Sequence, residues 1–227
     1  MKARRTLARP YRSGRCIDLL DATRHGRSST RGVGLDCEIP REGTLYDIYR
    51  RALDELHDVL IAVDENQEAA ALDLITEAKR IALYGVGREG LQIKGFAMRL
   101  FHLGLDAHVV GDMSVPNLGD GDLLIVSAGP GDFATVSALI GVAKAARAKT
   151  LCVTAEPDGA APRAANAIIT IPAQTMARDT TAPSSTLPMG SLYEGALYVL
   201  FEMLILKLRE RLSVTAVDMR SRHTNLE

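Results

Sequence analysis

The sequence lacks features that would place it in several large classes of protein. No stretch of it approaches the roughly 18 consecutive apolar residues that a membrane span needs, so we expect a soluble protein with no membrane partner. Its three cysteines, Cys16, Cys37 and Cys152, are an odd number without CxxC spacing, which argues against a disulfide framework and a zinc site. They favour a reducing compartment, so we predict a cytoplasmic location and no bound metal.

Over the whole chain, positive and negative charges nearly balance. The formal net charge of the 227 residues is −1, which offers no overall footprint for nucleic acid. Residues 1–42 differ from the rest, because they hold ten Lys and Arg against five Asp and Glu and show no helical or strand periodicity. With few large apolar side chains, they cannot offset the entropy of ordering. We expect a disordered basic extension, or sequence ahead of the native start, and a functional arm is the alternative.

The remaining residues, 43–227, are predicted to form one α/β domain. Apolar residues recur at spacings of three and four over 43–79, which predicts two N-terminal helices joined near Asp64. Short β-branched runs then alternate with helical patterns. The five predicted strands are RIALYG (80–85), DAHVV (106–110), DLLIVS (122–127), TLCVT (150–154) and AIITI (167–171). This alternation is typical of a parallel sheet that is covered by helices on both faces.

The predicted helices of the α/β core, 80–212, end in one long apolar segment. The helical stretches are 89–103, 133–148, a short one near 160–165, and 192–212. The last of these is apolar nearly all round, which suits burial between subunits. The polar segment 173–186 precedes it, and such loops often close over a ligand. Residues 213–227 are predicted to form a C-terminal tail.

Two glycine-containing turns follow predicted strands, GVGREG at 85–90 and SAGPGD at 127–132. Because ligands of doubly wound sheets bind outside the carboxyl ends of the strands, two such turns side by side predict a pocket for a compact anion. The first turn also matches a dinucleotide fingerprint, with Asp112 as the ribose-binding acid, so a nicotinamide-dependent oxidoreductase is one alternative. A turn that needs glycine only for packing is the other.

Several motifs together resemble one family. The motifs YGVGREG, KGFAMRLFHLGLDAHVVGD, GDLLIVSAGPGD, PMGSLYEGALYVLFE and MRSRHTNLE look like the sugar isomerase (SIS) domain, specifically its 6-phospho-3-hexuloisomerase branch. The resemblance covers roughly 43–227. It implies a flavodoxin-like three-layer sandwich with a five-stranded parallel sheet, a homotetramer or dimer, and aldose–ketose isomerisation of a sugar phosphate through an enediol, without a cofactor. A sugar-phosphate sensor without turnover is the alternative function.

By position, Glu194 matches the general base of the family, and His223 matches its histidine for ring opening or proton shuttling. Each has a simpler interpretation. Ser191 and Glu194 have the spacing of a capping box, in which Glu194 caps its own helix. His223 lies in a polar tail, where a solvated histidine is ordinary.

The sequence departs from the family in its anion-binding turns. Glu89 stands where the family has a serine, and Gly129 and Asp132 replace a serine and a threonine, which leaves Ser127 as the remaining hydroxyl. Two carboxylates would repel a phosphate dianion, so we predict an altered phosphate site that holds a neutral or cationic sugar derivative. Alternatively, Glu89 pairs with Arg88 or Lys94, and Asp132 caps the next helix. The predicted substrate-binding residues are Gly85, Gly87, Arg88, Glu89, Ser127, Gly129 and Asp132.

Overall fold

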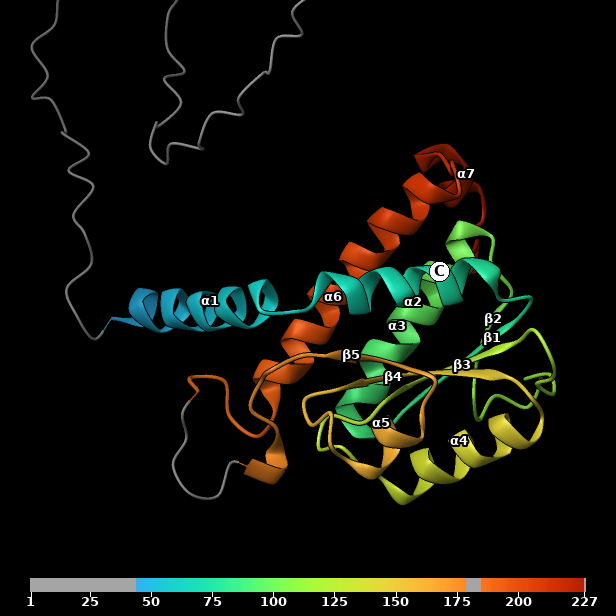
Figure 1. Cartoon of the computed structure of the whole chain (residues 1–227). Helices are drawn as coiled ribbons and strands as arrows, with labels where there is room; N and C mark the ends of the chain where they lie inside the picture. Colours follow the sequence, from blue (N-terminus) through green and yellow to red (C-terminus); the bar gives the residue numbers. More distant parts are fainter. Residues whose placement is uncertain (1–43, 179–184, 227) are drawn as a thin grey trace, which may run out of the picture. The chain divides into compact units, whose positions relative to one another are not determined.

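The computed structural model describes residues 44–178 and 185–226, so the predicted extension at 1–42 lies outside the described residues. Helices and strands alternate through most of the described chain (Figure 1). In chain order the elements are α1 (Leu45–Ile61), α2 (Glu65–Glu77), β1 (Ile81–Gly85), α3 (Gly87–Leu103), β2 (Ala107–Val109), β3 (Leu123–Ser127), α4 (Ala134–Ala145), β4 (Lys149–Thr154), α5 (Ala160–Ala164), β5 (Ala167–Thr170), a 3-10 turn (Met176–Arg178), α6 (Ser191–Arg211) and α7 (Ala216–Ser221).

The five predicted strands form one parallel sheet in the order β2-β1-β3-β4-β5. Alternate side chains of each inner strand enter different cores. In β3, Leu123 and Ile125 pack with α2, α3 and α6, whereas Leu124 and Val126 pack with α4 and α5. Figure 1 shows these two groups of helices on opposite faces of the sheet. The predicted three-layer sandwich with a five-stranded parallel sheet is therefore confirmed.

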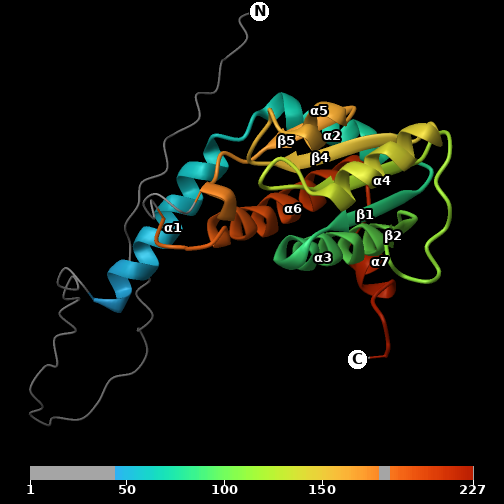
Figure 2. The same cartoon turned by 90° about the horizontal axis from the view of Figure 1, so that it is seen from below.

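The helices on the first face are held together by α6, which packs along α3. The rings of Phe96 on α3 and Phe201 on α6 stack with centroids 4.3 Å apart and planes inclined by 6°, a contact that adds to the area both rings bury. Helix α1 extends beyond the sheet beside the first half of α6 (Figure 2), where Leu56 lies close to Gly195. Much of α1 is nevertheless exposed and apolar, including Leu45 and Tyr49.

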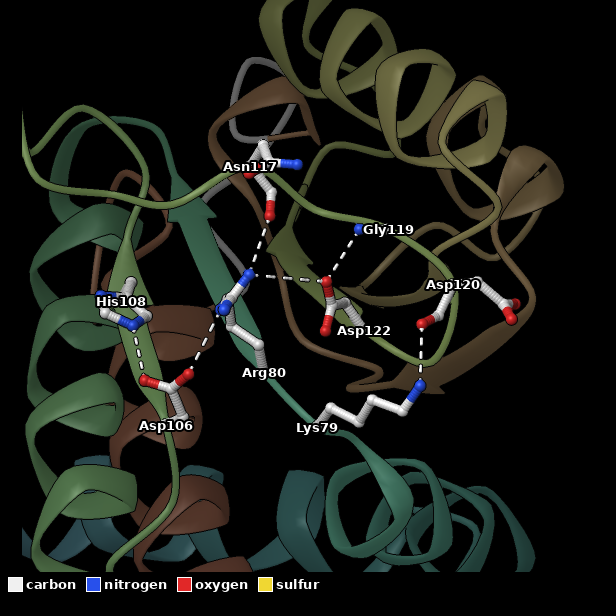
Figure 3. Close-up of polar contacts among 8 residues, drawn as sticks. All are labelled: Lys79, Arg80, Asp106, His108, Asn117, Gly119, Asp120 and Asp122. Carbon is white, nitrogen blue, oxygen red and sulfur yellow. Dashed lines mark hydrogen bonds and ion pairs between the residues drawn. The ribbon is translucent and has the colours of Figure 1, made fainter.

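A polar network at the amino ends of the strands holds the connection from β2 to β3 (Figure 3). Arg80 pairs with Asp106 (Nε to Oδ2, 3.2 Å) and donates to the backbone carbonyl of Asn117 (3.0 Å). The carboxylate of Asp122 accepts from the backbone N–H of Gly119 at 2.8 Å. These contacts lie at the amino ends of the strands, whereas the glycine-containing turns lie at the carboxyl ends. They therefore order the loop and are not part of a site at the turns.

Helix α4 ends at Ala145, three residues before the predicted end, and two other differences concern the site and the tail. Helix α3 begins at Gly87 instead of 89, because Gly87 has a positive φ of 57° that closes the turn directly onto the helix. Glu89 therefore belongs to the first turn of α3. Within the predicted tail, a short helix α7 forms because Thr215 and Asp218 cap it reciprocally. Among the helices of the described chain, none is long and apolar enough to cross a membrane.

Candidate functional site

A cavity of about 280 Å³ opens where the carboxyl ends of β1 and β3 meet the start of α6. Its volume is near the lower end of the range of about 300–1,000 Å³ for small-molecule pockets, which suits a monosaccharide-sized ligand. Four segments contribute to it: the start of α3, the loop after β3, the loop after β5, and the start of α6. Its walls are formed by Val86, Gly87, Arg88, Glu89, Pro130, Phe133, Thr175, Met176, Met189, Gly190, Tyr193 and Glu194.

Glu89 is a buried carboxylate in this wall, with 7% of the residue exposed. Its Oε2 accepts a hydrogen bond of 2.6 Å from the Ser127 hydroxyl and one of 3.1 Å from the backbone N–H of Gly129. Burial raises the pKa of Glu89, the two donors lower it, and the negative charge of Glu194 raises it again, so that the pKa lies above its ordinary value. Glu89 therefore faces the second turn and not Arg88 or Lys94.

Tyr193 completes this buried hydrogen-bonded group. Its hydroxyl oxygen lies 3.2 Å from Oγ of Ser127. Because the single proton of Ser127 goes to Glu89, Tyr193 is the donor in this contact. Gly129 is required beside them, since a Cβ on it would lie 2.8 Å from Cε1 of Tyr193 and 2.9 Å from Oε1 of Glu89. Tyr193 was not among the predicted site residues, because its position in a continuous apolar helix indicated core packing.

Glu194 lines the same cavity from the first turn of α6. Its Oε2 lies 3.0 Å from Nε of Arg88, and 16% of its side chain is exposed. Burial raises the pKa of Glu194 and Arg88 lowers it, with a net increase. Arg88 also donates to the hydroxyl of Ser191 (2.9 Å) and to the backbone carbonyl of Met189. The capping box is not formed, because the helix starts at Ser191 and its N-cap is Gly190.

Thr175, from the loop after β5, is a polar residue of the wall that the sequence analysis did not single out. It is 3% exposed, and its hydroxyl has no hydrogen-bond partner among the described residues. A buried hydroxyl without a partner is unfavourable. The predicted loop that contains Thr175 is described only in part, since 179–184 lie outside the described residues.

The structure brings together six of the nine predicted site residues. Gly87, Arg88, Glu89 and Glu194 line the cavity, and Ser127 and Gly129 lie directly behind Glu89. The other three, Gly85, Asp132 and His223, are not in its wall.

Each of these three residues has another contact. Gly85 allows β1 to approach α3, because a Cβ on Gly85 would lie 3.0 Å from the backbone nitrogen of Gly90 and 3.0 Å from Cγ1 of Ile93. Asp132 accepts a hydrogen bond of 2.5 Å from Ser137, while the N-cap of α4 is the next residue, Phe133.

The ring of His223 lies against that of His102, near the C-terminal end of α3, with centroids 5.2 Å apart. Within one chain it therefore lies at the far end of α6 from Glu194. Since the 21 residues of α6 span roughly 30 Å, the two side chains do not meet within one chain.

Other features of the described chain do not suggest a reactive centre. A cavity of about 320 Å³ between α3 and α6 is mainly apolar, and its ion pair is Arg99 with Glu202 (3.0 Å). Burial raises the pKa of the Cys152 thiol to about 12, which leaves it protonated and unreactive. Among the described residues, no group of three or more His, Cys, Asp or Glu could hold a metal ion.

The comparisons with known proteins identify relatives of this chain. The family model of the SIS domain matches residues 74–197. A 3-hexulose-6-phosphate isomerase of Bacillus subtilis (strain 168) is 33% identical over 175 residues, which are 77% of this chain and 95% of that protein. A 3-hexulose-6-phosphate isomerase of Mycobacterium gastri is 36% identical over 174 residues, 77% of this chain and 87% of that protein.

Solved structures show the same architecture. A hypothetical protein of Methanococcus jannaschii, whose structure infers a molecular function of 3-hexulose-6-phosphate isomerase, is 27% identical with a TM-score of 0.70, and the match covers 80% of this chain and 99% of that one. The NanR protein of Vibrio vulnificus, complexed with ManNAc-6P, is 20% identical with a TM-score of 0.61 over 80% of this chain and 66% of that one. A likeness at that level shows the fold alone, so function is argued from the site.

Proposed function

Because the chain belongs to the SIS domain family, we propose that it is an aldose–ketose isomerase that binds a monosaccharide in the cavity between the starts of α3 and α6. Glu194 acts as the general base. It removes a proton from the carbon next to the carbonyl and returns it to the former carbonyl carbon, while a proton moves between the two oxygens. The intermediate is an enediol. Because one carbon is oxidised as its neighbour is reduced, the reaction needs no external hydride acceptor, and we propose no organic cofactor.

The position of Glu194 carries this proposal. Its carboxylate lines the cavity and is oriented by Arg88, which is itself fixed by Ser191 and the Met189 carbonyl. A pKa above the ordinary value brings a carboxylate closer to the pH at which it works, which makes it a better base.

Substitution Glu194→Gln tests the proposal. A positioned general base typically increases the reaction rate by about 10²- to 10⁴-fold. In this variant kcat is therefore expected to fall by that factor, while the affinity for the ligand stays the same. Exchange of the substrate C–H proton with deuterated solvent is expected to stop as well. The matched control is Glu202→Gln. Glu202 lies on α6 like Glu194 and pairs with an arginine of α3, Arg99, but it is outside this cavity. Full turnover by the Glu194 variant would contradict the role.

A sensor gives a different result in the same experiment. If the native protein binds a sugar and shows no turnover or proton exchange, the family fold serves as a binding module here. The assay therefore starts with the native chain and a panel of ketoses and ketose phosphates.

For His223 we propose a catalytic role at the site of a second copy, in a dimer or tetramer. The exposed apolar face of α1, with Leu45, Tyr46, Ile48, Tyr49 and Leu53, supports such an assembly. Mixing Glu194→Gln and His223→Asn proteins tests the role, because mixed oligomers regain some intact sites if each site combines both residues. No regain of activity by the mixture, together with full activity of His223→Asn alone, would contradict it.

A further inference from the structure

The candidate cavity contains a carboxylate at the place where an anion would otherwise bind. Helix α3 begins at Gly87, and the free N–H groups of a helix N-terminus favour negative charge. Two further donors point to the same region, the hydroxyl of Ser127 and the backbone N–H of Gly129. Both are already bonded to Glu89, at 2.6 and 3.1 Å. The chain's own carboxylate therefore takes up the donors that a phosphate ester would use.

Glu89 is held firmly in this position. Tyr193 donates to Ser127, and Ser127 donates to Glu89, so a chain of hydrogen bonds from α6 through β3 ends on the carboxylate. The absence of a side chain at Gly129 leaves the room that the carboxylate fills. Moving Glu89 out would remove this acceptor from the buried N–H of Gly129 and leave the Ser127 hydroxyl with the contact to Tyr193, which is unfavourable.

The charges of the cavity wall also disfavour a phosphate. Among the described wall residues, Glu89 and Glu194 are acidic and Arg88 is basic, and Arg88 is engaged by Glu194 at 3.0 Å. One pair of like charges about 4 Å apart, at an effective dielectric constant of about 20, weakens binding by about 10³-fold. A phosphate dianion beside Glu89 meets this repulsion and gains no free cation in return.

The same wall offers groups that suit an uncharged or cationic ligand. Carboxylates accept strong hydrogen bonds from hydroxyl and ammonium groups. Thr175 adds a buried hydroxyl without a partner among the described residues. The wall thus combines a strong acceptor with a neutral group that both donates and accepts, which is the chemistry that binds hydroxyls of a sugar.

We propose that Glu89 selects against sugar phosphates, and that the substrate places a hydroxyl or ammonium group against this carboxylate where a phosphorylated sugar would place its phosphate. Glu89 is then a specificity-determining residue of the cavity. The identification of the ligand as a sugar rests on the proposed function, whereas the exclusion of phosphate does not.

Calorimetric titration of the full chain tests the inference with inorganic phosphate, a ketohexose, its 6-phosphate and the corresponding 6-amino sugar. The native protein is expected to bind the free or amino sugar more tightly than the phosphate ester, and inorganic phosphate only weakly. The comparison of the free and amino sugars distinguishes a hydroxyl from an ammonium group. In Glu89→Ser, affinity for inorganic phosphate is expected to rise by about 10²- to 10³-fold. Glu89→Gln, which keeps the shape of the side chain, gives a second measurement if the serine variant does not fold.

Asp132→Ser is the matched control, because it removes a nearby carboxylate that is not in the cavity wall. An equal gain of phosphate affinity in this control would overturn the assignment to Glu89, since it would reflect general charge. Tighter binding of the sugar phosphate than of the free sugars by the native protein would overturn it too, while leaving the isomerase proposal intact. Conversely, the native protein could isomerise no sugar while the Glu89 variants gain affinity for phosphate. This result would support the inference and reject the proposed function.

Discussion

The hydrogen bond from Ser127 to Glu89 makes a prediction about stability that depends on pH. Substitution Ser127→Ala removes the 2.6 Å hydrogen bond to Oε2 and the contact with the Tyr193 hydroxyl. A hydrogen bond to a charged group is worth about 1.5–3 kcal/mol, whereas one between neutral groups is worth about 0.5–1.5 kcal/mol. The cost of the substitution is therefore expected to depend on whether Glu89 is ionised.

The sign follows from the direction of the pKa shift. Because the pKa of Glu89 is higher in the folded than in the unfolded chain, the folded state binds more protons, and stability falls as pH rises through the folded pKa. Ser127 lowers that pKa, so its removal raises the pKa further and enlarges this loss. Near pH 4.3, the ordinary pKa of glutamate, Ser127→Ala is expected to lower the free energy of unfolding by about 1 kcal/mol. At about pH 8 it is expected to lower it by about 2–3 kcal/mol.

Urea denaturation at both pH values measures this difference, at one protein concentration in case the chain is oligomeric. Ser137→Ala is the matched control, because its hydroxyl also donates to a carboxylate, that of Asp132, but at the surface. Its effect is expected to stay within about 0.5 kcal/mol at either pH. A cost for Ser127→Ala that is the same at both values, or larger at low pH, would refute the picture of a buried, ionisable Glu89 held by Ser127.

Three further substitutions test the packing and the charges near the site. Gly90→Ala places a Cβ 2.5 Å from the backbone oxygen of Gly85 and is expected to destabilise the protein by about 1–3 kcal/mol. In Gly95→Ala the new Cβ has no atom within 4 Å, so this substitution is expected to stabilise α3 by about 0.5–1 kcal/mol. Thermal unfolding of the two variants measures the difference. Arg88→Gln removes the cation that lowers the pKa of Glu194, so the acidic limb of the rate against pH is expected to move to higher pH, and a shift to lower pH would contradict the ion pair.

The fold was predictable because its inner strands are buried on both faces. Runs such as LLIVS in β3 are continuously apolar, and the structure places all five of their residues in the interior, so the five strands were found within one or two residues. The helix α7 was missed because six residues give no periodicity. Its signal, the capping pair Thr215 and Asp218, was present in the sequence.

The candidate site was only partly predictable, because its contacts join residues far apart in the chain. Glu194 has the local spacing of a capping box, and only its contact with Arg88, 106 positions earlier, shows a different partner. Tyr193 and Thr175 occupy an apolar helix and a polar loop, and neither pattern indicates that both enter one cavity. The replacement of a serine by Glu89 was visible, but its direction toward Ser127 depends on the packing of the two turns.

The two carboxylates of the cavity owe their different proposed roles to their partners. Glu194 has a cation at 3.0 Å and a partly exposed side chain, so it ionises with support from Arg88. Glu89 is more deeply buried, and its hydrogen-bond donors among the described residues are neutral. Burial raises its pKa, and the charge of Glu194 raises it further. Of the two carboxylates, Glu89 is therefore the one whose ionisation costs more free energy. This difference supports the two proposed roles, which are proton transfer for the carboxylate beside the arginine and recognition for the one held by neutral donors.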